Sequence, residues 1–111
     1  MKQHSDIIVL GGGLAGLVSA ILLNRNKRSV LLIEKKKYPF HRVCGEYISN
    51  EVKPFLEKHG LMPKNVKPSK IDRFQLSSLK GKTKTLELDL GGFGLSRYEL
   101  DYHLFHLALA E

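Results

Sequence analysis

The sequence predicts an α/β fold that contains a βαβ unit, a parallel core sheet and an inserted β-hairpin. Two short apolar runs, residues 7–10 and 30–33, flank a segment whose apolar residues recur at helical spacing. A cluster of glycines separates the first run from that segment. Further along the chain, two strand-like runs surround the turn Lys80-Gly81-Lys82.

The first part of the chain supplies the βαβ unit. Residues 7–10 form a continuous apolar run, which is typical of a strand buried on both faces of a parallel sheet. From Leu14 to Asn24, apolar residues recur every three or four positions, and this spacing predicts an amphipathic helix. Polar and basic residues 24–28 suit a helix end and a loop, after which residues 30–33 predict the second buried strand.

The second part of the chain predicts a short helix, a hairpin and a final helix. The short helix is expected at about residues 52–59, with a proline in its first turn. The hairpin strands are expected at 71–79 and 83–90, and the second strand alternates leucines with polar residues. The glycine-rich segment 91–94 is expected to break that strand, and apolar spacing from Tyr98 onward predicts the final helix.

Composition limits the class of protein. A chain of 111 residues is one domain at most, and 42% hydrophobic with 26% charged residues is the balance of a soluble globular protein. The single cysteine, Cys44, excludes an intramolecular disulfide and favours a reducing, cytoplasmic location. Apolar runs fall short of the roughly 20 residues that a membrane helix needs. The net charge of +7 is spread over several segments without interleaved aromatic residues, so we expect no nucleic-acid partner.

The glycine cluster matches the pattern G-x-G-x-x-G at Gly11, Gly13 and Gly16. Its context is that of a Rossmann-like dinucleotide site, because a predicted strand precedes it, a predicted helix follows it, and Glu34 ends the second strand. The three glycines permit a tight turn, close approach of a pyrophosphate, and close packing of helix on strand. Helix N-terminal amides then attract the diphosphate, and the Glu34 carboxylate suits ribose hydroxyls rather than a 2′-phosphate.

The motif thus predicts a dinucleotide that contains adenosine, and two questions remain open at this point. The motif does not distinguish FAD from NAD. The same residues would also fit a plain strand-turn-helix whose glycines only permit tight packing, with Glu34 as a solvated charge.

Two further segments, together with the glycine motif, carry a resemblance to a known family. They are YPFHRVCGEYIS at residues 38–49 and GLSRYELD at residues 94–101. With them, the sequence resembles the flavoprotein family that includes the geranylgeranyl reductases. That family lies within the para-hydroxybenzoate hydroxylase-like superfamily, together with flavin monooxygenases and flavin-dependent halogenases. The three motifs together cover most of residues 6–104.

The resemblance implies a bound FAD and assigns its contacts. The glycine turn and the start of the helix would hold the diphosphate, Glu34 the adenosine ribose, and Lys35 would lie beside the adenine. Arg42 and the Cys44–Tyr47 stretch would run along the cofactor toward the flavin, and Arg97 would bind from the start of the last helix. The cofactor-binding set implied in this way is Gly11, Gly13, Leu14, Ala15, Gly16, Glu34, Lys35, Arg42, Cys44, Gly45, Glu46 and Arg97.

Each of these residues also has a structural interpretation. Cys44 fits a small buried hydrophobe as well as a reactive thiol. Arg42 fits a surface charge, and Arg97 is spaced to pair with Asp101 on its own helix. The histidines lack metal-ligand spacing, so no metal site is predicted, and no acid, base or nucleophile is assigned.

The resemblance also implies that the flavin-binding fold continues beyond residue 111 and that a substrate domain is absent from this chain. Residues 1–111 are therefore expected to be the N-terminal part of an FAD/NAD(P)-binding domain. The predicted function is the FAD-binding portion of a flavin-dependent oxidoreductase, a reductase or monooxygenase of a small or lipid-like substrate, with NAD(P)H as a candidate electron donor. The alternatives are an NAD-binding dehydrogenase fragment and a non-catalytic nucleotide-binding module. Substrate and oligomeric state are left open.

Overall fold

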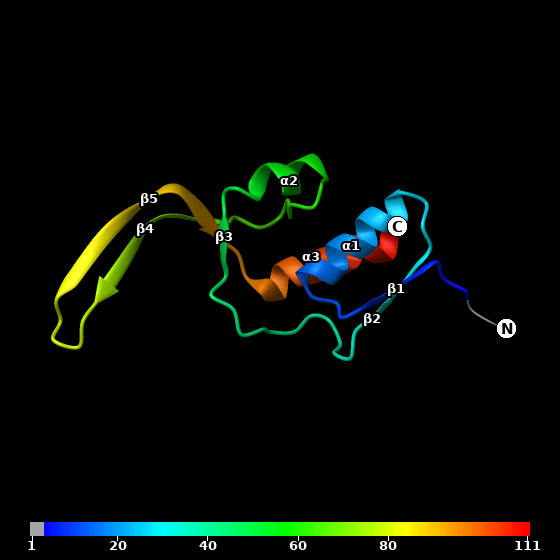
Figure 1. Ribbon diagram of the computed structural model, residues 1–111, viewed down its shortest axis with the longest axis horizontal. Helices are drawn as coiled ribbons and strands as arrows, with labels where there is room; N and C mark the ends of the chain where they lie inside the picture. The colour runs from blue at the N-terminus through cyan, green and yellow to red at the C-terminus, as the bar shows by residue number, and fades with distance from the viewer. Residues whose placement is uncertain (1–3) are drawn as a thin grey trace. The chain divides into compact units, whose positions relative to one another are not determined.

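The computed structural model describes residues 4–111, and their helices and strands follow the order β1, α1, β2, β3, α2, β4, β5, α3 (Figure 1). The chain divides into two compact units. Unit 1 contains the chain up to Val43 together with Arg97–Glu111, and unit 2 is Cys44–Ser96. Each unit is described separately below.

Unit 1 contains the predicted βαβ unit and the last helix. Strands β1 (Ile7–Leu10) and β2 (Val30–Ile33) pair in parallel, with α1 (Leu14–Arg25) between them in the sequence. Helix α3 (Arg97–Ala110) returns to this unit and packs against α1 (Figure 1). The α/β fold with a parallel core sheet is therefore confirmed.

The core of unit 1 lies where α1 meets the sheet and α3. Its buried apolar side chains come from the two helices, and burying each leucine or isoleucine contributes about 1.5–3 kcal/mol. At the end of α1, the side-chain amide of Asn26 donates from Nδ2 to the carbonyl of Leu22 at 2.8 Å, which satisfies one of the last carbonyls of the helix. The buried residues are Leu17, Ala20, Ile21, Leu100 and Leu104.

The parallel strands are covered on one face only, which corrects the prediction of strands buried on both faces. Along both strands, partly buried side chains alternate with exposed ones, because α1 packs on one face of the sheet. On the other side, Ile8, Leu10, Leu31 and Ile33 are exposed, with Leu10 at 84%. Their apolar side chains predict that both faces of the sheet are covered, but a single layer of helices covers only one face.

Unit 2 contains a three-stranded antiparallel sheet and one short helix. Strands β4 (Ser69–Ser77) and β5 (Thr83–Gly94) form the predicted hairpin, and β3 (Tyr47–Ser49) pairs with the far end of β5. The hairpin closes with a hydrogen bond of 2.8 Å from the Ser78 amide to the Lys82 carbonyl. Helix α2 (Lys53–Lys58) falls inside the predicted range 52–59, with proline in its first turn.

Strand β5 continues through the glycine-rich segment, so the predicted break at residues 91–94 is wrong. Gly92 pairs with Ser49 of β3 on one side and with Ile71 of β4 on the other. Gly91 has a φ of +67°, next to an irregularity in the pairing between Ile71 and Arg73. These glycines let β5 bend at a bulge and keep its hydrogen bonds, which glycine permits at low steric cost.

Within residues 4–111, no helix combines the length and the apolar character that a membrane crossing requires.

Candidate dinucleotide site

The glycine turn joins β1 to α1, and its glycines meet three different requirements. Gly11 has a φ of +101° and donates its amide to the Ile33 carbonyl at 2.8 Å. A side chain at Gly16 would collide with the carbonyl oxygen of Gly11, so Gly16 allows the helix to lie against the turn. At Gly13, the N-cap residue of α1, nothing lies closer than 3.9 Å to the position of a Cβ. A Cβ at Gly13 would thus meet the guanidinium groups of Arg42 and Arg97 at ordinary van der Waals distance.

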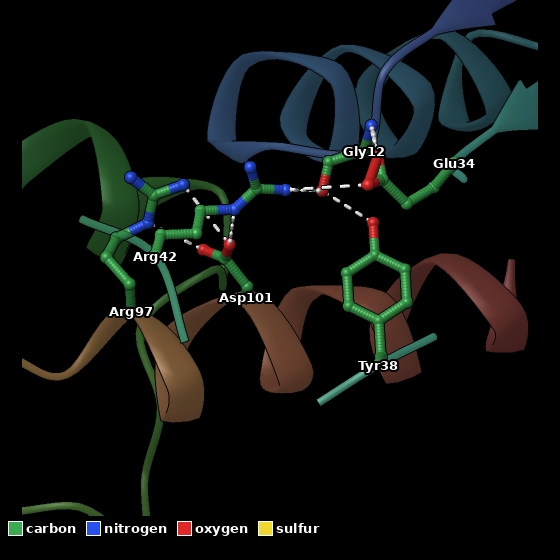
Figure 2. Close-up of polar contacts among 6 residues, drawn as sticks. All are labelled: Gly12, Glu34, Tyr38, Arg42, Arg97 and Asp101. Atoms are coloured by element: carbon green, nitrogen blue, oxygen red, sulfur yellow. Dashed lines mark hydrogen bonds and ion pairs between the residues drawn. The ribbon is translucent and has the colours of Figure 1, made fainter. Parts of the chain in front are cut away.

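The Gly12 peptide groups are held on both sides by side chains (Figure 2). Its amide donates to Glu34 Oε2 at 2.8 Å, at the end of β2. Its carbonyl accepts from the Tyr38 hydroxyl at 2.5 Å and from Arg42 Nη2 at 3.3 Å. Both polar groups of this peptide are thus satisfied within the chain, and the turn is fixed before any ligand arrives.

Tyr38 is held in place by aromatic packing. Its ring stacks on Phe105 of α3 with centroids 4.3 Å apart, and it contacts Phe40 at 5.4 Å. Partial burial, together with the negative charge of Glu34, raises the pKa of the Tyr38 hydroxyl above its ordinary value. The hydroxyl therefore keeps its proton at neutral pH and donates it to the Gly12 carbonyl.

Two arginines converge beside Gly13 because one buried carboxylate holds both. Asp101, only 2% exposed, accepts from Arg42 Nε at 2.8 Å through Oδ2. It accepts from Arg97 Nε at 2.8 Å through Oδ1, and Arg97 Nη2 lies 3.2 Å from Oδ2. Both guanidinium groups lie 3.9 Å from the position of a Gly13 Cβ. Figure 2 shows the two arginines meeting at Asp101.

The local charge is balanced close to neutrality. Two guanidinium groups face the Asp101 carboxylate and the Glu34 carboxylate, whose Oε1 is 4.0 Å from Arg42 Nη2. The Arg42 guanidinium also lies over the Phe40 ring, 4.5 Å from its centroid. Asp101 contacts both arginines more closely than Glu34 does, so the arginines are fixed chiefly from the side of α3.

The structure brings together many of the residues implicated by the sequence. The glycine turn, Glu34, Arg42 and Arg97 form one cluster in unit 1. Leu14 and Ala15 are the first residues of α1, and Lys35 follows Glu34 as an exposed side chain. The surface-charge interpretation of Arg42 is wrong, since its side chain is only 28% exposed and is hydrogen bonded to Asp101.

The remaining three residues lie in unit 2. Cys44 is exposed, so its interpretation as a buried hydrophobe is wrong. The Glu46 amide donates to Cys44 Sγ at 3.3 Å, and Glu46 has a φ of +58°. The Glu46 carbonyl accepts from the Leu95 amide at 3.0 Å, which ties this bend to the end of β5.

Three residues that organise the cluster are missing from the predicted cofactor-binding set, namely Gly12, Tyr38 and Asp101. Tyr38 begins one of the quoted motifs without a predicted role, and Asp101 ends another with a predicted role only as the partner of Arg97. Asp101 had a local signal in its four-residue spacing from Arg97. Its contact with Arg42, 59 residues away, had none.

Comparison with known proteins agrees with this architecture. Residues 9–63 match the family of NAD(P)-binding Rossmann-like domains. The flavin-dependent halogenase armH4 of Armillaria mellea is 33% identical over 100 residues, covering 82% of this chain and 18% of the halogenase.

Two solved structures share the fold. A geranylgeranyl bacteriochlorophyll reductase-like protein of Thermoplasma acidophilum superposes with a TM-score of 0.74 and 24% identity, over 96% of this chain and 28% of its own. The p-nitrophenol 4-monooxygenase PnpA of Pseudomonas putida gives a TM-score of 0.79 at 15% identity. The match covers 99% of this chain and 30% of PnpA. This chain thus spans less than a third of each of these proteins.

The matched domain family and the two solved structures show a Rossmann-like fold. The halogenase relative, matched over 82% of this chain, supports the resemblance to the FAD-dependent oxidoreductase superfamily that includes the geranylgeranyl reductases and para-hydroxybenzoate hydroxylase-like proteins.

Proposed function

We propose that this chain is the FAD-binding portion of a flavin-dependent oxidoreductase, with the diphosphate at the glycine turn and the adenosine ribose at Glu34. One observation carries the proposal. Two fixed guanidinium groups converge on Gly13 at the start of α1, each 3.9 Å from the position of a Cβ. Arginine forks beside the N-terminal amides of a helix are an arrangement that suits a diphosphate.

The chemistry of the cluster suits a diphosphate. Gly13 caps α1, so the unpaired amides of the first helical turn and the positive end of the helix dipole lie beside it. Arginine matches phosphate oxygens because its planar fork presents several N–H donors. Because the two arginines are already balanced by two carboxylates, a diphosphate would be held by these directed N–H donors and by the helix dipole, and not by an excess of positive charge.

Glu34 suits the ribose. Its Oε2 already accepts from the Gly12 amide at 2.8 Å, which orients the carboxylate at the edge of the turn. Carboxylate oxygens have further lone pairs that accept from ribose hydroxyls, while the charge repels a 2′-phosphate. Lys35, exposed beside it, is proposed to lie next to the adenine.

The reaction is proposed from the resemblance. FAD, when bound, supplies hydride or oxygen chemistry at its isoalloxazine ring, and the residues of this chain supply binding and orientation. We propose a reductase or monooxygenase that acts on a small or lipid-like substrate in the cytoplasm, with NAD(P)H as electron donor. Cys44, Gly45 and Glu46 are proposed to line the route toward the flavin.

A second candidate is an NAD-binding portion of a dehydrogenase. The match of residues 9–63 to an NAD(P)-binding domain family favours it, and the glycine turn with Glu34 would serve either dinucleotide.

The test is a visible absorption spectrum of the 111-residue chain after incubation with FAD and removal of unbound cofactor. We expect a retained flavin spectrum that Gly13→Val abolishes, because the valine methyl groups would press on the two guanidinium groups and cover the helix N-terminus. Ser19→Val is the matched control, since it places the same side chain at an exposed position of the same helix. Retention of NAD but not FAD would favour the dehydrogenase, and retention of neither would contradict both candidates.

A further inference from the structure

We infer that Asp101 is a positioning residue that holds Arg42 and Arg97 toward the glycine turn and so gives the site its selectivity for a diphosphate. This inference rests on the proposed function and deepens it. It assigns to a buried acid on α3 a part in binding an anion that this acid would itself repel.

The geometry gives Asp101 control over both arginines. Each carboxylate oxygen accepts at 2.8 Å from the Nε of a different arginine, so neither guanidinium can rotate without losing a charge-assisted hydrogen bond. Asp101 is 2% exposed, whereas the arginine side chains are 28% and 16% exposed. The acid is thus buried, while parts of both arginine side chains remain accessible.

The two arginines reach the turn from distant parts of the sequence. Arg42 lies in the segment after β2, and Arg97 is the first residue of α3. Arg42 is further oriented by its contact with the Gly12 carbonyl at 3.3 Å. Both arginines donate a hydrogen bond to the Asp101 carboxylate. This carboxylate holds the two guanidinium groups at the same distance from Gly13.

Positioning and net charge predict opposite effects of removing this carboxylate. If only charge matters, Asp101→Asn strengthens anion binding, because a negative group leaves the site. If Asp101 acts by orienting the arginines, the same substitution weakens binding of the diphosphate, since flexible arginines must be ordered when the ligand binds.

The experiment measures the affinities of ADP and adenosine for the 111-residue chain and for Asp101→Asn by calorimetry. ADP carries the diphosphate and adenosine does not. We expect ADP affinity to fall by about tenfold, the effect of about one charge-assisted hydrogen bond, with adenosine affinity unchanged. The matched control is Glu99→Gln, which removes one negative charge from an exposed position of the same helix and should leave both affinities unchanged.

Combining the substitutions tests whether Asp101 affects ADP binding through the two arginines. In an Arg42→Ala, Arg97→Ala background, adding Asp101→Asn should cause no further loss of ADP affinity, because the groups it positions are gone. The inference is overturned if Asp101→Asn leaves ADP affinity equal or higher, or lowers ADP and adenosine alike. If the unmodified chain binds neither FAD nor ADP, the proposed function is overturned and this inference with it.

A second measurement uses the unmodified chain alone, so its result does not depend on whether a variant folds. In the unmodified chain, the Nε–H protons of Arg42 and Arg97 should exchange slowly with water in NMR spectra and should shift when ADP is added. Arg73 in β4 is the control, since its side chain is 70% exposed and its contact with Asp72 is 3.5 Å long. Exchange of Arg42 and Arg97 as fast as that of Arg73 would overturn the inference.

Discussion

The chain contains two glycine clusters, residues 11–16 and 91–94, and they differ in what surrounds them. In the second cluster, a side chain at Gly92 would collide with the carbonyl of Ile48 on the paired strand. In the first cluster, Gly13 faces two guanidinium groups, each 3.9 Å from the position of a Cβ. Glycine density alone therefore does not point to a binding site. Our proposal of a site at the first cluster depends on the charged groups that face it.

The two clusters also differ in how their backbones are fixed. The second is fixed by strand pairing, because β3 and β4 flank β5 on either side. The first has no such pairing beyond Gly11, and side chains hold Gly12 instead, from Glu34, Tyr38 and Arg42. Side chains are easier to change than strand pairing, so the first cluster is open to dissection by substitution.

The largest expected effect is that of Gly16→Val. Its side chain would collide with the Gly11 carbonyl, and α1 would have to move off the turn. We expect the free energy of unfolding to fall by about 3 kcal/mol, which is the upper part of the range for overpacking. Urea unfolding followed by circular dichroism measures it. Gly13→Ala is the matched variant and should change stability little, and an equal loss in the two would remove the distinction between these glycines.

Gly92→Ala tests the second cluster. The added methyl group meets the Ile48 carbonyl and the Tyr47 ring, so the pairing of β3 with β5 should loosen, at a cost of about 2 kcal/mol. Hydrogen exchange should accelerate at the Asn50 amide, which donates to the Gly91 carbonyl at 3.1 Å, while ADP affinity at low temperature stays unchanged. A loss of ADP affinity in a folded variant would show that the contrast between the clusters is wrong.

Tyr38→Phe tests the side-chain support of the first cluster. It removes the hydroxyl that donates to the Gly12 carbonyl but keeps the ring that stacks on Phe105. We expect a loss of about 1 kcal/mol in the free energy of unfolding, which is typical of one hydrogen bond. Tyr102→Phe, on the same helix as Phe105, is the control. Equal losses in the two variants would argue against a special role for the Tyr38 hydroxyl.

The smallest effect is expected at Asp6, just before β1. Hydrogen bonds from the amide and hydroxyl of Ser29 lower the pKa of Asp6 below its ordinary value. A lowered folded-state pKa stabilises the fold above the unfolded value of about 3.9, and this contribution disappears as pH falls through the folded value. Asp6→Asn should therefore lower Tm slightly at neutral pH, and the difference should vanish in acid. A Tm difference that is constant with pH would contradict this assignment.

Local sequence patterns predicted the elements of unit 1 well. Strands β1 and β2 and helix α1 follow from continuous apolar runs and helical spacing, which depend on near neighbours. Strand β3 was not predicted, because its three residues show no alternation of apolar and polar side chains. The end of β5 was missed because glycine is usually a strand breaker, and only its partners on β3 and β4 explain why it continues.

The candidate site was predictable only in part. The glycine turn and Glu34 follow from spacing along the sequence. The role of Asp101 follows from a contact with Arg42 across 59 residues, and that of Tyr38 from a contact with Gly12 across 26. Such contacts depend on where α3 packs against the βαβ unit, which no local pattern specifies.

The Gly12 peptide has one further consequence, for the rate and specificity of ligand capture. Because its amide and carbonyl are already occupied, the backbone there has no group left to offer a ligand. In the proposed site, recognition would therefore fall to the amides that follow at the start of α1 and to the two arginines. A turn that needs no refolding allows association limited by diffusion and charge, not by a slow loop movement.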